Sequence, residues 1–229
     1  MVSMDADYKS RLAGIAEKTI NRYCGRLKKF GYDPRTLGWG DRQQQHYRFA
    51  QTLAGPIEFN ARTVLDIGCG FGDYRDFLHE SEIAVAAYKG WDINADLVTE
   101  ASRRHRNDLM TEFSVFNLLS PDLDEAAIKP IANIGVMLGV LNFNLGDQAS
   151  NYRYTDLALT RAWGLVDTAL VVDFLSAHRT PNYAAEPGVF YHDPSRMIEY
   201  ALSLSSSVTL MHNYLPIPQR EFMLFIERE

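Results

Sequence analysis

Residues 63–74 constrain the fold more than any other part of the chain. They begin with a short apolar run that is typical of a buried strand, and three glycines at alternate positions, Gly68, Gly70 and Gly72, then interrupt it. Residues 74–79 have the composition of a helix start. A strand, a glycine-rich turn and a helix N-terminus together bring bare backbone close to a ligand. This stretch therefore predicts a ligand-binding turn at the end of a strand.

The charge of this turn argues against a dinucleotide. A dinucleotide-binding pattern would follow Gly68 and Gly70 with a third glycine at position 73, where this chain has Asp73. A carboxylate at a helix start repels a pyrophosphate. Asp66, just before the turn, adds a second negative charge. The acidic turn therefore favours a cationic ligand that carries an amino group and a ribose, and we do not expect NAD to bind.

The turn resembles the first motif of the class I S-adenosylmethionine (SAM) dependent methyltransferases. That motif is an acidic residue at a strand end followed by Gly-x-Gly-x-Gly, and it matches Asp66, Gly68, Gly70 and Gly72. The family's second mark is an acidic residue that ends the next strand, about twenty residues on, and holds the ribose hydroxyls. In this chain that position is occupied by Asp92.

Two further features of the family follow in order. Its third strand often ends in Asp and an apolar residue, whereas this chain has Asn117 and Leu118, and Asn can still accept a hydrogen bond. The fourth strand, residues 134–138, runs into residues 139–142, much as the family's fourth strand runs into its acceptor site. The resemblance covers roughly residues 60–229. It implies the family's fold and SAM as the ligand.

The length and composition of the chain are those of a globular protein with one sizeable core. A net charge of −6 argues against a nucleic acid or an anionic membrane as a partner. Two cysteines make no disulfide framework, and no cluster of Cys and His has the spacing of metal ligands, so we expect no metal. No apolar stretch approaches the ~20 residues that span a bilayer. We therefore expect a cytoplasmic monomer or homodimer that acts on a small molecule.

Beyond the turn, strand-like segments alternate with helical patterns. Strands are expected at 63–68, 86–92, 111–117, 133–139 and 168–174, and helices at 73–80, 94–106, 122–128, 151–166 and 194–203. This alternation predicts a parallel sheet with helices on both faces. Two last strands, 206–214 and 221–226, predict an antiparallel hairpin at the sheet edge. The expected fold class is thus α/β, a Rossmann-like seven-stranded sheet with an antiparallel C-terminal hairpin strand.

Residues 1–59 precede this pattern and have a helical character. Helices are expected at 11–30 and 42–53, the second of them capped by Asp41. We expect this segment to form an N-terminal helical cap over the site. The SAM-binding core then spans residues 60–229, and the whole chain makes one structural domain.

The resemblance implies a role for each residue near the turn. Gly68 and Gly70 line the methionine portion, Asp66 orders the loop and reaches the amine through water, Asp92 takes the ribose, Ile93 lies against adenine, Asn117 and Leu118 flank the adenine edge, and the Leu138 carbonyl faces the amine. Three positions have structural alternatives. Asp66 could cap its own turn, Asp92 could be a helix N-cap unless Asn94 takes that role, and Asn117 could serve only its turn.

The cap supplies the remaining candidates for cofactor binding. The carboxylate of SAM needs a donor, and Arg48 is our candidate, with Gln45 one helical turn before it and on the same face. The alternative is that this is simply a solvated helix face. Trp39 could pack over the ligand or belong to the core.

The candidates for catalysis lie where the fourth and fifth strands end. Sulfonium is a good leaving group, so positioning and dehydration can carry much of the catalysis. Asn142, Tyr152 and Asp173 are the candidates. A carboxylate that ends a buried strand needs a partner, so Asp173 is the leading candidate of the three. Its alternative role is structural, in a salt bridge to Arg153 or Arg161.

Three functions fit these features. The first is methyl transfer from SAM to a small molecule by in-line displacement. The second is a SAM cyclase, in which the amine of SAM attacks its own γ-carbon, expels methylthioadenosine and closes azetidine-2-carboxylate. The third is a SAM-binding module without catalysis. The residues themselves do not decide which carbon of SAM reacts.

Overall fold

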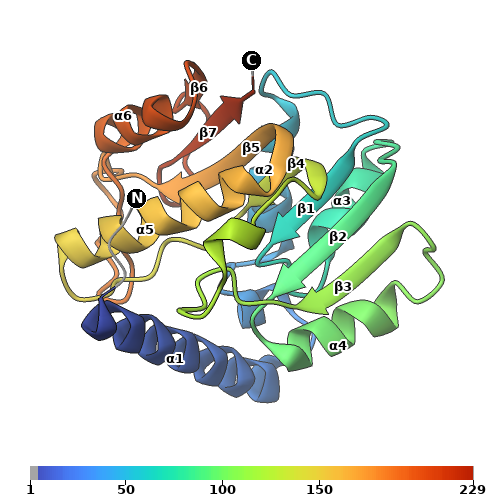
Figure 1. Ribbon diagram of the computed structural model, residues 1–229, viewed down its shortest axis with the longest axis horizontal. Helices are drawn as coiled ribbons and strands as arrows, with labels where there is room; N and C mark the ends of the chain where they lie inside the picture. The colour runs from blue at the N-terminus through green and yellow to red at the C-terminus, as the bar shows by residue number, and fades with distance from the viewer. Residues whose placement is uncertain (1–4, 229) are drawn as a thin grey trace.

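The computed structural model describes residues 5–228. Its strands are β1 (Thr63–Ile67), β2 (Ala87–Asp92), β3 (Thr111–Val115), β4 (Ala132–Met137), β5 (Val166–Leu175), β6 (Ser207–Met211) and β7 (Glu221–Glu227). They form one seven-stranded sheet in the order β3-β2-β1-β4-β5-β7-β6 (Figure 1). Strands β1 to β5 pair in parallel, whereas β7 is antiparallel to both neighbours, β5 and β6. The predicted fold class is confirmed.

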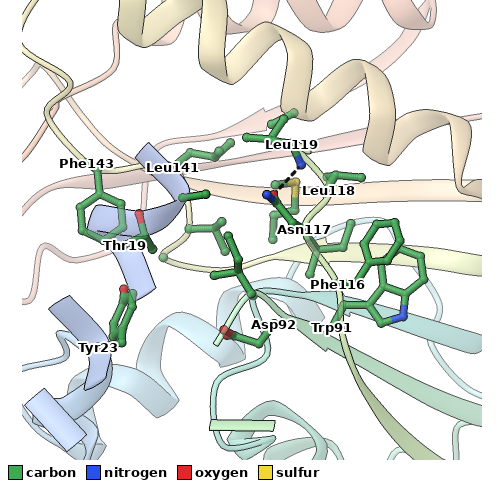
Figure 2. Close-up of a pocket in the computed structure, with 18 of the residues that line it drawn as sticks. Thr19, Tyr23, Trp91, Asp92, Phe116, Asn117, Leu118, Leu119, Leu141 and Phe143 are labelled. Atoms are coloured by element: carbon green, nitrogen blue, oxygen red, sulfur yellow. Dashed lines mark hydrogen bonds between the residues drawn. The ribbon is translucent and has the colours of Figure 1, made fainter. Parts of the chain in front are cut away.

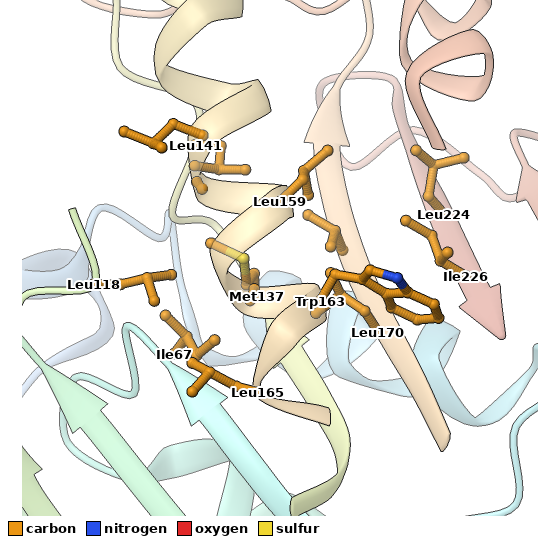
Figure 3. Packing of buried hydrophobic residues seen from close by; sticks show 14 of the residues in the cluster. Ile67, Leu118, Met137, Leu141, Leu159, Trp163, Leu165, Leu170, Leu224 and Ile226 are labelled. Atoms are coloured by element: carbon orange, nitrogen blue, oxygen red, sulfur yellow. The ribbon is translucent and has the colours of Figure 1, made fainter. Parts of the chain in front are cut away.

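Helices cover both faces of the sheet. They are α1 (Ala6–Phe30), α2 (Arg42–Leu53), α3 (Asp73–Glu80), α4 (Ala95–Arg104), α5 (Gln148–Gly164) and α6 (Pro194–Leu204). Alternate residues of the strands point to opposite faces. Leu65 and Leu170 pack in a cluster with α5 and α6, whereas Val64 and Val171 pack in a second cluster with α2 and α3. Figure 3 shows the first cluster, which includes Leu159 and Trp163 of α5, Leu170 of β5 and Leu224 of β7.

Helix α1 lies beside the carboxyl ends of β1, β2 and β3 (Figure 1). Asp5 caps it, with one carboxylate oxygen accepting the Tyr8 N–H at 2.8 Å, and Gly31 ends it with φ = +64°. Of its 25 residues only Tyr8 and Leu12 are buried, and both pack into the cluster of α5 and α6. The N-terminal segment is therefore packed against the same core as the sheet.

Three of the expected helices differ most from the observed ones. The helix expected at 122–128 is only a 3₁₀ turn, Glu125–Ala127. This short segment is followed by Pro130, and a helix of a single turn gains too little to pay for its nucleation. The helix expected from 151 begins at Gln148, because Asp147 caps it there, and the helix expected from 11 begins at Ala6.

No helix within residues 5–228 combines the length and the apolar composition that a membrane crossing requires.

Candidate functional site

A pocket lies at the carboxyl ends of β1, β2, β3 and β4 and is bordered on its other side by α1 (Figure 2). The helix contributes Leu12, Ala16, Thr19 and Tyr23, and the following turn contributes Leu37 and Trp39. The strand ends contribute Ile67 and Gly68, 91–93, 116–119 and 137–141. Phe143, Tyr154 and Ala158 complete the wall. This is the edge at which open α/β sheets bind ligands.

The glycine turn needs its glycines for two reasons. Gly68, Gly70 and Gly72 have φ of +85°, +55° and +78°, a region that side chains disfavour. There is also no room, because a Cβ on Gly68 would lie 2.5 Å from a methyl of Val140, and one on Gly70 would lie 2.8 Å from Leu37. The turn thus brings backbone directly to the pocket wall, as the sequence predicts.

Asp92 is a buried carboxylate on the wall of this pocket. Its two oxygens accept the N–H groups of Gly70 at 3.0 Å and Asn94 at 2.8 Å. Burial raises the pKa of Asp92, and these backbone donors oppose that rise. Each oxygen of a carboxylate can accept two hydrogen bonds, so both keep capacity for hydroxyl donors. The helix N-cap is Asn94, whose side chain accepts the N–H groups of Asp96 and Leu97.

Apolar side chains flank Asp92 on the side of β3. Ile93 and Leu118 line the pocket, and the rings of Trp91 and Phe116 pack with their centroids 4.0 Å apart. Asn117 also lines the pocket, while its side-chain oxygen accepts the Leu119 N–H at 3.0 Å (Figure 2). Asn117 therefore serves its turn and still faces the pocket.

Asp66 and Gln45 border a second, smaller cavity that also touches Trp39 and Leu138. The hydroxyl of Tyr88 donates to Asp66, and burial raises the pKa of Asp66 to about 7. Gln45 donates to Asp73 at 3.0 Å. The volume is about 20 Å³, which is room for one water molecule. The predicted contact of Asp66 with the ligand amine through water stays a prediction.

Arg48 is enclosed between three side chains. It forms an ion pair with Glu221, its guanidinium lies 4.7 Å from the centroid of the Trp39 ring, and it interacts electrostatically with Asp173. Its Nε has no hydrogen-bond partner among residues 5–228. Trp39 lines the pocket, and Arg48 does not. The predicted contact between Arg48 and the SAM carboxylate stays a prediction, because the guanidinium is here paired with Glu221.

Asp173 is fully buried and lies on the α2 face of β5. Its Oδ1 accepts the Gly139 N–H at 2.5 Å, while its Oδ2 has no partner in the described chain. Burial raises the pKa of Asp173, and the nearby Arg48 guanidinium opposes that rise. Neither of the partners proposed from the sequence is used, since Arg161 pairs with Glu125 and Arg153 pairs with Asp5.

The other two catalytic candidates lie outside the pocket wall. The side-chain oxygen of Asn142 accepts the Leu175 N–H at 3.0 Å and so links the loop after β4 to the end of β5. The hydroxyl of Tyr152 accepts the Asp193 N–H at 3.1 Å. Asn142, Tyr152 and Asp173 are absent from the lining residues, so their catalytic roles stay predictions.

Several lining residues were missed by the sequence analysis. Thr19 and Tyr23 lie on α1, and Phe143 and Tyr154 lie after β4 (Figure 2 labels the first three). Burial, together with the Asp92 carboxylate, raises the pKa of Tyr23 to about 12. Burial also raises the pKa of Tyr154. Helical spacing on α1 could have suggested Thr19 and Tyr23 as one face, but not which strands they meet.

The lining is poor in groups that titrate. Asp92 is the single carboxylate in it, the two tyrosines are neutral phenols at neutral pH, and the described lining contains no Lys, Arg or His. Among residues 5–228, no three His, Cys, Asp or Glu side chains are grouped as metal ligands would be. Such a wall can hold a ribose and an apolar ring and can exclude water, but it offers few proton acceptors.

Comparison with protein-family models and with curated protein sequences gave no match. Solved structures do match. Magnesium protoporphyrin IX methyltransferase (ChlM) from Synechocystis PCC 6803, solved with bound SAH, has a TM-score of 0.61 at 15% identity, over 93% of this chain and 100% of that one. The small RNA methyltransferase HEN1 has a TM-score of 0.59 at 16% identity, over 82% and 26%.

The [4+2]-cyclase SpnF also matches, with a TM-score of 0.53 at 12% identity, over 74% of this chain and 60% of that one. These similarities are far too low in sequence to carry an activity from one protein to another. They do show that the folds are alike. The chain has the fold of the class I SAM-dependent methyltransferases.

Proposed function

We propose that this protein binds SAM in the pocket under α1 and transfers its methyl group to a small molecule. The observation that carries the proposal is the buried Asp92 carboxylate, held by the glycine turn on a pocket wall that continues into the apolar surface of Ile93 and Leu118. A ribose diol is the natural donor pair for such a carboxylate. Adenine fits the adjoining apolar surface. Residues 1–59 act as the cap and residues 60–229 as the core.

The acceptor is proposed to be small because of what borders the pocket. The 25-residue helix α1 lies beside the strand ends and contributes Leu12, Ala16, Thr19 and Tyr23 to the wall. The net charge of −6 also disfavours a polyanion such as RNA. The acceptor's lone pair attacks the methyl carbon, the carbon–sulfur bond breaks, and sulfur keeps the bonding pair as S-adenosylhomocysteine. With so few titrating groups in the wall, positioning and dehydration supply the catalysis.

A second function is favoured by the same shortage of titrating groups. A dry pocket lowers the pKa of an amine, because the charged form loses its solvation. The neutral amine of SAM could then attack its own γ-carbon, and the sulfur of the leaving methylthioadenosine would keep the bonding pair. This SAM cyclase reaction forms azetidine-2-carboxylate and needs no acceptor.

One experiment separates the two reactions. The pure protein is incubated with SAM alone, and the products are followed by mass spectrometry. A methyltransferase without its acceptor is expected to consume SAM negligibly and to release at most traces of S-adenosylhomocysteine. Steady formation of methylthioadenosine and a four-carbon amino acid in equal amounts would overturn methyl transfer in favour of the cyclase. Protein carrying Asp92→Ala is the control for non-enzymatic breakdown of SAM.

A further inference from the structure

The end of β4 contains a peptide whose orientation is set by a side chain from another strand. The β4–β5 ladder ends with the pair Met137 and Val172. The N–H of Gly139, two residues beyond the end of β4, takes no part in this ladder. It donates instead to Asp173 Oδ1 at 2.5 Å. The Asp173 carboxylate therefore continues the ladder where the backbone stops.

This hydrogen bond determines where the Leu138 carbonyl points. The Leu138–Gly139 peptide is trans, and in a trans peptide the N–H and the C=O point in opposite directions. In the sheet, β4 has β5 on one side and β1 on the other (Figure 1). Because the Gly139 N–H points to β5, the Leu138 carbonyl points to the side of β1, which is the side of the glycine turn.

The Leu138 carbonyl lies beyond the end of the backbone pairing between β1 and β4. The β1–β4 ladder ends at the pair Asp66 and Val136, before it reaches Leu138. Within residues 5–228, no backbone N–H outside the helices and strands bonds to the Leu138 oxygen. Leu138 and Gly68 both line the pocket. The pocket therefore presents a carbonyl acceptor beside the glycine turn.

The charges behind this peptide alternate in sign. Glu221 pairs with Arg48, Arg48 interacts with Asp173, and Asp173 accepts the Gly139 N–H. A negative charge at the N–H end of a peptide strengthens the partial negative charge on its carbonyl oxygen. This row of alternating charges thus ends at the Leu138 carbonyl oxygen, an acceptor that suits a cation.

We propose that Asp173 is a positioning residue, which turns the Leu138 carbonyl toward the glycine turn and so makes an ammonium-binding end of the pocket. This proposal rests on the proposed function, in which SAM is the ligand. It adds that the Leu138 carbonyl binds the SAM amine and that Asp173 orients this carbonyl through the Gly139 N–H. It also explains why a carboxylate is buried at the end of β5 without lining the pocket. Asp173 touches neither ligand nor reacting atoms in this arrangement.

The test compares two ligands that differ only in the amine. Isothermal titration is carried out with S-adenosylhomocysteine and with its desamino analogue, in which hydrogen replaces the α-amino group. The wild-type protein is expected to prefer the amine by about tenfold or more, the value of one charge-assisted hydrogen bond. Asp173→Ala should abolish this preference and leave the affinity for the desamino analogue within about twofold.

Two further variants serve as controls for the effect of Asp173→Ala. Asp173→Asn keeps an oxygen that can accept the Gly139 N–H, so it should retain part of the preference, whereas Asp92→Ala should weaken both ligands alike. Equal weakening of both ligands by Asp173→Ala, or no effect, would overturn the role of Asp173 while SAM binding stands. A wild-type protein that binds neither ligand would overturn the proposed function itself.

A spectroscopic measurement needs no variant. The sequence contains only three Leu–Gly pairs, at 37–38, 138–139 and 145–146, so carbonyl-labelled leucine with nitrogen-labelled glycine makes the Leu138–Gly139 peptide visible among three signals. The Leu138 carbonyl signal is expected to shift with S-adenosylhomocysteine and to shift much less with the desamino analogue. Identical shifts with both ligands would contradict the proposal even if Asp173→Ala failed to fold.

Discussion

Replacement of Asp92 by alanine should affect ligand affinity and stability through separate contacts. On the ligand side, the ribose loses charge-assisted hydrogen bonds worth about 1.5–3 kcal/mol, so SAM should bind about one to two decades more weakly. On the protein side, the N–H groups of Gly70 and Asn94 lose their acceptors. Each unpaired N–H costs about 1–3 kcal/mol, so the two together cost about 2–6 kcal/mol, and in a domain of this size the Tm should fall by about 4–24 °C.

The measurement combines calorimetric titration of SAM with thermal unfolding in the absence of ligand. Asp193→Ala is the matched control, because Asp193 is also a carboxylate that accepts a backbone N–H, that of Ser195 at 2.9 Å, but it caps α6 and does not line the pocket. It should lower the Tm and leave the SAM affinity within about twofold. NAD should show no binding to either variant or to the wild type. An Asp92→Ala protein that is folded and binds SAM with unchanged affinity would remove Asp92 from the site.

Two further changes act on the buried charges. Burial holds the Asp66 pKa at about 7, above its unfolded value, so the native state binds the extra proton and stability falls as the pH rises from about 4 to 7. Asp66→Asn removes that loss of stability. In urea unfolding, the free energy of unfolding of the variant relative to that of the wild type should rise by on the order of 2 kcal/mol between pH 5 and pH 8. A difference between the two proteins that does not change with pH would contradict a raised pKa at Asp66. Arg48→Ala leaves Asp173 and Glu221 without their cation, which should lower the free energy of unfolding by about 3–5 kcal/mol and the Tm by about 6–20 °C. Adding Glu221→Gln to this variant should recover part of the lost stability. If Arg48 instead binds the ligand carboxylate, the same variant should bind SAM and decarboxylated SAM equally well in a titration.

The parts of the site that sequence reasoning could predict are those set by local rules. A glycine turn after a strand requires its positive φ angles and its lack of side chains whatever surrounds it, so Gly68 and Gly70 could be placed directly. Asp92 could be placed because it ends the next strand of a parallel sheet, whose carboxyl ends meet at one edge. Both of these predictions need only the order of the elements.

The parts that could not be predicted depend on how distant segments meet. The ion pair between Arg48 and Glu221 could not be predicted, because Glu221 lies 173 positions away on β7 and only the antiparallel register that pairs Leu175 with Glu221 places Glu221 beside Asp173. Likewise Tyr23 enters the pocket because of where α1 docks on the sheet, which no helical periodicity specifies. The helix predicted at 122–128 is the opposite case, because its sequence pattern is too short to determine the local structure, which is a 3₁₀ turn.

The position of β7 has a consequence for how the protein is made. It is the last strand of the sheet in chain order, yet it lies between β5 and β6, and six of its seven residues are buried. Until Glu221–Glu227 has been synthesised, β5 presents a long apolar edge with unpaired backbone groups, which is the kind of edge that recruits other chains. Strands β1 to β5 alone therefore leave one side of the sheet open, and β6 can join it only through β7. Arg48 and Asp173 likewise gain the third charge of their cluster, Glu221, only with this strand, so the ion pairs behind the Leu138–Gly139 peptide are completed by the last strand of the sheet to be synthesised.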